Sequence, residues 1–124
     1  MPSYFADSYA LIEMLKGNKN YRSFQSERLI TTEFNICEAG FAVCRDYPEN
    51  APNVLKTVRK MVTLQETRDE DYCSGAAWRK MGSDKGKKLS TIDCVGYAVA
   101  NRLNIPFLTG DREFADMQNV QFVK

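Results

Sequence analysis

Short apolar runs alternate with longer helical patterns along the whole of this 124-residue chain. The first run, at residues 3–7, precedes a helical stretch at 8–16, and a late run at 105–109 follows an amphipathic stretch that begins at residue 90. This alternation favours a parallel sheet covered by helices on both faces, because parallel strands need a crossover connection between them. We therefore expect an α/β fold of three layers, α/β/α, around a mostly parallel sheet of roughly four to five short strands.

Helical spacing of apolar residues is clear in the middle of the chain. Phe34, Cys37, Phe41 and Cys44 recur three and four residues apart within 33–46, which predicts a helix that buries this face. Residues 29–31 could form a short strand or lead into that helix. The other expected elements are helices at 51–62, 67–81 and 90–103 and strands at 62–64 and 120–123.

The helix expected at 67–81 has explicit signals at both ends. Thr67 and Glu70 have the spacing of a capping box, and Gly82 is a typical stop. We expect the polar, lysine-bearing segment 83–89 that follows to be a loop. With no linker, repeat or composition change, residues 1–124 are expected to form one domain.

Composition narrows the class of protein. No apolar run approaches the roughly 18 residues of a membrane span, and the first residues lack the basic and long apolar parts of a signal peptide. We therefore expect a cytoplasmic protein with no membrane contact. The formal net charge is only +1, so any binding of nucleic acid must use a local basic patch.

Several chemistries are excluded by the residues that the chain lacks. It contains no histidine, which excludes Ser-His-Asp and Cys-His triads. Its four cysteines form no CxxC pair, so a structural zinc site is not indicated and free thiols are expected. The segment Asp7-Ser8-Tyr9 lacks the Asp-x-Asp of haloacid-dehalogenase-like phosphatases, and the acid and lysine pattern of a response-regulator receiver is missing.

Four acidic residues stand where an acid does little to build a fold. Asp7 ends the first strand-like run, Asp111 follows the late one, and Glu38 and Asp93 lie in helical stretches with mostly apolar neighbours. Buried acids need a partner. If these four meet in space without a Lys or Arg among them, the natural partner is a divalent metal ion.

Three of the four acids also have an ordinary structural explanation. Asp7 could cap the helix that follows it, Asp111 could serve a turn after Gly110, and Asp93 completes a Ser90-x-x-Asp93 capping pattern. Glu38 is harder to explain, because it shares a helix face with the aromatic residues four before and three after it. On a buried face its pKa would rise unless a positive group met it.

Four segments in order carry a resemblance to a known family: Asp7–Gly17, Glu38–Gly40, Leu89–Asp93 and Thr109–Phe114. With these segments the chain resembles the PIN-domain ribonucleases and, within them, the small VapC-type toxins. The resemblance spans almost the whole length. It departs from the family pattern at Tyr9, where a small polar residue is common, and at Gly110, where a larger residue is common.

The resemblance implies an endoribonuclease that depends on one or two Mg²⁺ or Mn²⁺ ions. It assigns Asp7, Asp93 and Asp111 as metal ligands and Glu38 as a ligand through water or a water-orienting group. Ser8 and Thr109 would support the acids by hydrogen bonds. It further implies an RNA substrate, a small antitoxin protein as partner and a homodimer.

Basic residues precede the helix that carries Asp93. Lys85, Lys87 and Lys88, with Arg112 beside Asp111, could bind RNA phosphates, although an ordinary solvated loop explains the lysines equally well. Two alternatives to a toxin stay open. One is an RNA-processing PIN nuclease with the same site, and the other is a catalytically silent PIN-like module that binds RNA or protein.

Overall fold

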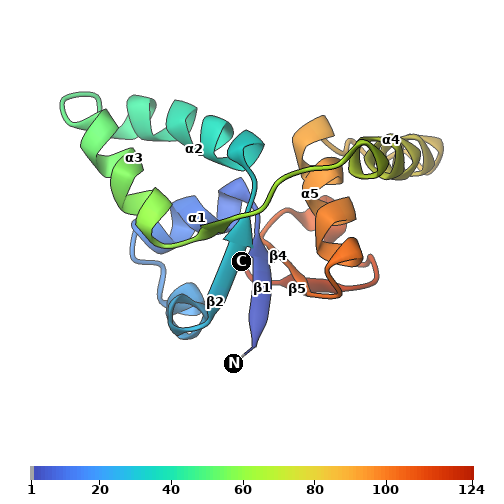
Figure 1. The fold of residues 1–124 in the computed structure, drawn as a ribbon, viewed down its shortest axis with the longest axis horizontal. Helices are drawn as coiled ribbons and strands as arrows, with labels where there is room; N and C mark the ends of the chain where they lie inside the picture. The colour runs from blue at the N-terminus through green and yellow to red at the C-terminus, as the bar shows by residue number, and fades with distance from the viewer. Residues whose placement is uncertain (1) are drawn as a thin grey trace.

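The computed structural model describes residues 2–124, which form five parallel strands in one sheet with helices on both sides (Figure 1). The sheet order is β3-β2-β1-β4-β5, and every neighbouring pair is parallel. The strands are β1 Ser3–Ala6, β2 Arg28–Thr31, β3 Thr63–Leu64, β4 Phe107–Thr109 and β5 Val120–Phe122. The predicted fold class is confirmed, and residues 29–31 belong to a strand.

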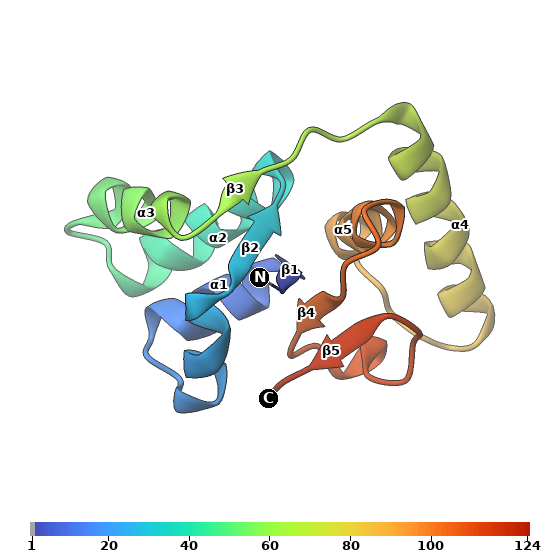
Figure 2. The same cartoon turned by 60° about the horizontal axis from the view of Figure 1, so that its bottom comes forward.

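Five α-helices cover the sheet, with α1, α2 and α3 on one side and α4 and α5 on the other (Figure 1). Their bounds are α1 Ser8–Leu15, α2 Glu33–Asp46, α3 Ala51–Lys60, α4 Asp69–Asp84 and α5 Thr91–Arg102. Two 3₁₀ segments complete the structure, η1 Lys19–Ser26 and η2 Arg112–Phe114; η1 was not predicted. Figure 2 shows the connection after β3 crossing over to α4 on the opposite side. Within residues 2–124, no helix is both long enough and apolar enough to cross a membrane.

The central strand β1 marks the point where the strand order changes direction. It pairs with β2 on one side and with β4 on the other, so the carboxyl ends of β1 and β4 lie next to each other. The Asp7 amide extends this pairing by donating to the Leu108 carbonyl oxygen at 3.2 Å. In open parallel sheets ligands bind at such a switch point, outside the carboxyl ends of the strands.

Apolar side chains fill the layer on each side of β1 and β4. Toward α5, Phe5 and Phe107 stack with ring centroids 5.7 Å apart, and Phe107 also packs against Tyr97 and Phe114. Toward α1 and α2, the buried residues include Leu11, Ile36 and Leu108. Packing on both faces holds the two strand ends in fixed positions, which in turn fixes the side chains that follow them.

The prediction of which face of α2 is buried is wrong. Phe34 and Phe41 are 42% and 77% exposed, and Cys37 and Cys44 are exposed as well. The helix instead buries a neighbouring stripe that the sequence also supports: Asn35, Ile36, Ala39 and Val43. Both stripes have helical spacing, and the buried one is the stripe that packs against α1 and α3.

The predicted ends of α4 are also wrong. The helix begins after Arg68, whose backbone amide donates to the Asp71 carboxylate at 2.8 Å, so the capping pair lies one residue later than expected. It continues through Gly82 to Asp84. Gly82 is a packing site rather than a stop, because a Cβ there would lie 2.5 Å from a Leu89 methyl group.

Candidate active site

The four acids that the sequence singled out line one pocket at the carboxyl edge of the sheet. The pocket has a volume of about 400 Å³, and its wall is completed by Tyr9, Gly110, Arg112 and Lys124. Asp7 follows β1, Asp111 follows β4, and Glu38 and Asp93 come from α2 and the first turn of α5. Residues that are far apart in sequence therefore meet where the topology predicts a ligand.

Asp7 combines its two expected roles. It is the N-cap of α1, where its carboxylate accepts a hydrogen bond from the Ala10 amide at 2.8 Å. Its second oxygen accepts a hydrogen bond from the Thr109 hydroxyl. The side chain is only 1% exposed. Burial and the nearby charge of Asp93 raise the pKa of Asp7 well above its usual range, despite both hydrogen bonds.

Asp93 lies in the first turn of α5, and its amide donates to the Ser90 hydroxyl at 3.1 Å. The hydrogen bond to the Ser90 side chain is the half of the predicted capping pattern that the structure shows. Burial, followed by repulsion from Glu38, raises the pKa of this carboxyl to about 6, and Asp111 adds to the shift. The acids therefore interact electrostatically across the pocket.

Asp111 and Asp7 are linked through one hydroxyl group. The Asp111 amide donates to Thr109 Oγ1 at 3.0 Å, while the Thr109 hydroxyl donates to Asp7. Asp111 also caps η2 by accepting from the Glu113 amide at 3.0 Å. Thr109 is fully buried, so it holds the two strand-end acids in a fixed relation.

Glu38 reaches the pocket for a different reason from the one expected. The aromatic side chains before and after it point to solvent, and Glu38 itself is half-buried rather than part of the core. It lines the pocket together with the other three acids. The argument from a shared buried face was therefore wrong, and the role of Glu38 in the site stays a prediction.

Ser8 does not contact the acids by hydrogen bonds. Its hydroxyl donates to the Asn35 backbone oxygen at 3.2 Å and accepts from the Asn35 side-chain amide at 3.4 Å. Asn35 in turn accepts from the Thr32 hydroxyl at 2.7 Å. This buried polar network connects α1 to the start of α2, directly beneath the turn that carries Glu38. Sequence reasoning missed Asn35, which only tertiary packing reveals.

The predicted RNA-binding residues are divided between different surfaces. Arg112 lines the acidic pocket, whereas Lys85, Lys87 and Lys88 do not. Lys87 is held by the Asp116 carboxylate at 2.5 Å and by the Glu113 carbonyl at 3.0 Å. Lys87 and Lys88 both line another cavity, of about 800 Å³, between α4 and the start of α5.

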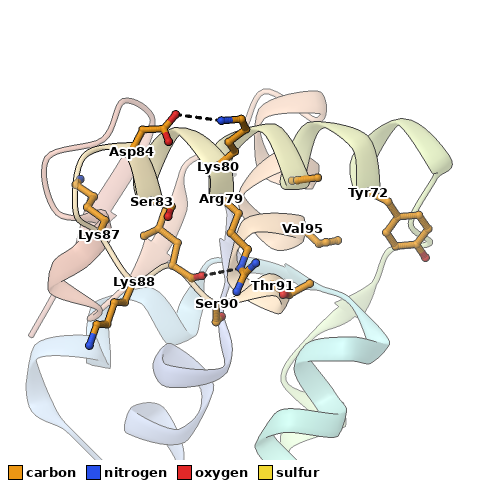
Figure 3. A pocket seen from close by; sticks show the side chains of 13 residues that line it. Tyr72, Arg79, Lys80, Ser83, Asp84, Lys87, Lys88, Ser90, Thr91 and Val95 are labelled. Carbon is orange, nitrogen blue, oxygen red and sulfur yellow. Dashed lines mark hydrogen bonds and ion pairs between the residues drawn. The ribbon is translucent and has the colours of Figure 1, made fainter.

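That cavity is basic along one side (Figure 3). Arg79 and Lys80 extend from α4, and Arg79 Nε donates to the Leu89 carbonyl at 3.3 Å beside Ser90. Ser90, which caps the helix that carries Asp93, lies on the wall of this cavity, but among residues 2–124 the cavity and the acidic pocket share no lining residue.

Three pocket residues were not predicted as site residues: Tyr9, Gly110 and Lys124. Lys124 Nζ donates to the Gly110 carbonyl at 3.1 Å and lies 4.8 Å from the centre of the Tyr9 ring. Tyr9 gave a signal as a departure from the family pattern, whereas nothing in the sequence marked Lys124. Neither Lys124 nor Arg112 neutralises the acids, since none of the four forms an ion pair within residues 2–124.

The donor set fits a hard divalent cation. Carboxylate oxygens are the ligands that Mg²⁺ and Mn²⁺ prefer, and the raised pKa values of Asp7 and Asp93 show that negative charge is destabilised here. In the part of the chain that the structure describes, no three acidic or cysteine side chains stand close enough to hold an ion as placed. Binding would therefore require the side chains to converge.

A family model decides the assignment: the PIN-domain model matches residues 4–120. The chain belongs to the PIN-domain family. Comparison with curated protein sequences finds no significant match. The match of the PIN-domain model confirms the family that the sequence resembles.

Solved structures share the PIN fold of this chain at low sequence identity. VapBC2 from Rickettsia felis, bound to a promoter DNA fragment, matches with a TM-score of 0.77 and 12% identity, over 98% of this chain and 99% of the other. DNA-bound VapBC from Salmonella typhimurium gives 0.77 and 15%, over 98% and 97%. VapC20 from Mycobacterium tuberculosis, a sarcin-ricin loop cleaving toxin, gives 0.71 and 16%, over 95% and 98%.

Proposed function

We propose that this PIN-domain protein is a Mg²⁺- or Mn²⁺-dependent endoribonuclease. The observation that carries the proposal is the pocket in which Asp7, Glu38, Asp93 and Asp111 gather without an ion pair. Mutual repulsion and burial destabilise the charged carboxylates, and a divalent cation relieves both effects. A pure binding module gains nothing from such a cluster, which argues against the catalytically silent alternative.

Each residue has a role that follows from its place. Asp7, Asp93 and Asp111 would hold one or two ions, and Glu38 would bind through water or orient the attacking water. When bound, the ions would activate that water and stabilise the phosphate charge. Thr109 fixes Asp7 and Asp111 through its shared hydroxyl. Ser8 supports the site indirectly, through the network that anchors α2 to α1.

RNA must approach this acidic pocket over basic surroundings. Arg112 lies on the pocket wall, and Lys88 and Arg79 line the separate cavity between α4 and the start of α5. We assign phosphate contacts to these residues before Lys85 and Lys87, because Lys87 is already paired with Asp116. Phosphate contacts position the chain without reading its sequence.

The biological role that we favour is the toxin of a toxin–antitoxin pair. Two DNA-bound VapBC complexes and a toxin–antitoxin complex from Klebsiella pneumoniae share the fold over nearly the whole chain. A small antitoxin and a second copy of this chain would then be the protein partners. An RNA-processing nuclease would use the same site, and a small antitoxin reading frame next to the gene would distinguish the two roles.

The first test is thermal melting with and without Mn²⁺ or Mg²⁺. We expect the ions to stabilise the wild type, by about 2.7 kcal/mol at a hundredfold excess over Kd. Asp7→Asn should lose this response, while Glu49→Gln, a charge removal at an exposed position, should keep it. Metal-dependent cleavage of RNA should likewise disappear in Asp93→Asn. A wild type that does not respond to millimolar ions would contradict the proposal.

A further inference from the structure

Three chain segments build one wall of the acidic pocket beside the proposed metal ligands. Tyr9 comes from the first turn of α1, Gly110 from the end of β4, and Lys124 lies two residues beyond β5. Tyr9 and Gly110 lie far apart in the sequence, and in the structure they are in contact.

The Tyr9 ring explains the glycine at position 110. A Cβ built on Gly110 would lie 2.0 Å from Tyr9 Cε1 and 2.5 Å from Cδ1, distances that real atoms do not adopt. The backbone does not require glycine here, since positive φ angles among the glycines of residues 2–124 occur only at Gly17 and Gly86. Gly110 therefore makes room for an aromatic side chain at the pocket wall.

The ring is placed where a bound chain would pass. Tyr9 is half-buried, and it lines both the acidic pocket and a second pocket between α1 and α2. Lys16 and Arg45 lie on the wall of the second pocket, each in a partly exposed ion pair, with Glu13 at 3.7 Å and with Asp46 at 3.0 Å. An RNA strand that leaves the acids in this direction would cross Tyr9 before it meets the next cations.

We propose that Tyr9 positions the substrate by stacking on the base of a nucleotide next to the scissile phosphate, while the Lys124 ammonium group binds a neighbouring phosphate oxygen. This inference rests on the proposed nuclease function. Aromatic rings bind nucleobases in this way without strict sequence preference. The Lys124 ammonium donates one hydrogen bond to Gly110 and lies over one face of the Tyr9 ring, so the base would stack on the opposite face. Two N–H groups of Lys124 are left for a phosphate.

The stacking role is tested by variants that separate the effect of the aromatic ring of Tyr9 from the effect of side-chain size. Binding of a short fluorescent single-stranded RNA of mixed sequence is measured in Mg²⁺, in an Asp93→Asn background that cannot cleave. Tyr9→Leu should weaken binding by about 5-fold to 100-fold, and Tyr9→Phe should restore it to within about twofold. The matched control Tyr47→Leu, at a partly exposed tyrosine away from the pocket, should bind normally.

Two outcomes would overturn the role of Tyr9. If Tyr9→Leu binds RNA as tightly as its background, the ring does not stack on substrate. If Tyr9→Phe and Tyr9→Leu lose affinity equally, the effect comes from the hydroxyl or from a changed fold. The melting temperature of each variant identifies the second case, since a stacking role leaves it unchanged in Tyr9→Phe.

The role of Lys124 is tested by the salt dependence of binding. Lys124→Gln should weaken binding and reduce the slope of log affinity against log salt by about one. Lys56→Gln, at an exposed lysine of α3, is the matched control and should change neither. An unchanged slope in Lys124→Gln would exclude the phosphate contact.

Failure of this inference is distinguishable from failure of the proposed function. Metal stabilisation in melting experiments reports the acids alone, and Tyr9→Leu should retain it. A protein that responds to Mn²⁺ but shows no Tyr9 effect keeps the nuclease proposal and refutes the stacking role. A wild type without metal response refutes the nuclease proposal itself.

Discussion

Two aspartates of this protein are almost equally buried and have opposite electrostatic surroundings. Asp7 is 1% exposed and Asp71 is 2% exposed. Arg102 donates to both oxygens of Asp71 at 2.9 Å, and the Arg68 amide adds a third hydrogen bond. Asp7 receives hydrogen bonds from Ala10 and Thr109 but no guanidinium or ammonium group.

The pKa values follow this difference. Burial raises the pKa of Asp71, but the hydrogen bonds and charge of Arg102 outweigh burial and leave the pKa below its usual range. For Asp7, burial and the charge of Asp93 leave the pKa well above that range. The fold thus provides a cation where a buried carboxylate only joins α4 to α5. It provides none at the pocket, where we propose that a metal ion takes that place.

The largest expected effect comes from breaking the structural pair. Arg102→Leu leaves Asp71 buried without its partner and releases the Glu66 carbonyl, to which Arg102 donates at 3.3 Å. We expect a loss of about 3–5 kcal/mol in the free energy of unfolding, measured by urea denaturation. The variant should keep its response to Mn²⁺ for as long as it is folded.

An exposed ion pair of the same geometry is the matched control. Arg59 donates to both oxygens of Glu33 at 2.8 and 2.7 Å, but both side chains are largely exposed. Arg59→Leu should cost much less stability than Arg102→Leu, because solvent screens an exposed pair. Equal losses in the two variants would mean that burial of Asp71 does not determine the strength of its pair.

The next effect concerns the pH dependence of stability without divalent ions. The pKa of Asp93 is raised from 3.8 to about 6, so the folded state binds a proton that the unfolded state has already released. Stability should therefore fall as the pH rises from about 4 to about 6, by up to about 3 kcal/mol from this group. Urea denaturation in EDTA across this range measures the slope.

Asp93→Asn should flatten the slope of unfolding free energy against pH. Saturating Mn²⁺ should reverse this slope in the wild type, because the ion favours the ionised Asp93 carboxylate. Asp71→Asn is the contrasting variant. Because the pKa of Asp71 is lowered, its contribution is lost only below pH 3.8 or so, and the slope between pH 4 and 6 should stay unchanged. If the stability of the wild type in EDTA rises between pH 4 and 6, the carboxylates of the pocket do not repel one another.

The sequence predicted most of the fold because the relevant signals are local. The alternation of strands and helices, the Ser90 cap and the strand-end positions of Asp7 and Asp111 follow from short-range patterns. The buried face of α2 was misread, because two stripes with the same spacing compete and only packing against α1 and α3 decides between them. The predicted end of α4 at Gly82 was wrong, because the glycine there allows close packing against Leu89 and does not end the helix.

The site was predictable only in part, for a similar reason. Four acids in a characteristic order pointed to one pocket, and the structure brings them together. The coupling of Tyr9 to Gly110 and the approach of Lys124 are long-range contacts between segments that carry no common motif. Such contacts depend on how strand ends are juxtaposed, which a single sequence does not specify.

The smallest expected effect concerns the hydrogen bond that holds the buried Asp7 carboxylate in place without a positively charged partner. The buried Thr109 hydroxyl donates to Asp7 and accepts from the Asp111 amide, so Thr109→Val removes both interactions at nearly constant volume. We expect a loss of about 1–2 kcal/mol in unfolding free energy at neutral pH, and a higher Mn²⁺ concentration for half-maximal stabilisation. Thr109→Ser keeps the hydroxyl and should retain the metal response of the wild type. If the Thr109→Val protein binds Mn²⁺ as tightly as the Thr109→Ser protein, the Thr109 hydroxyl is not needed to position Asp7 for the ion. Burial at the end of β1 is then enough to position that carboxylate.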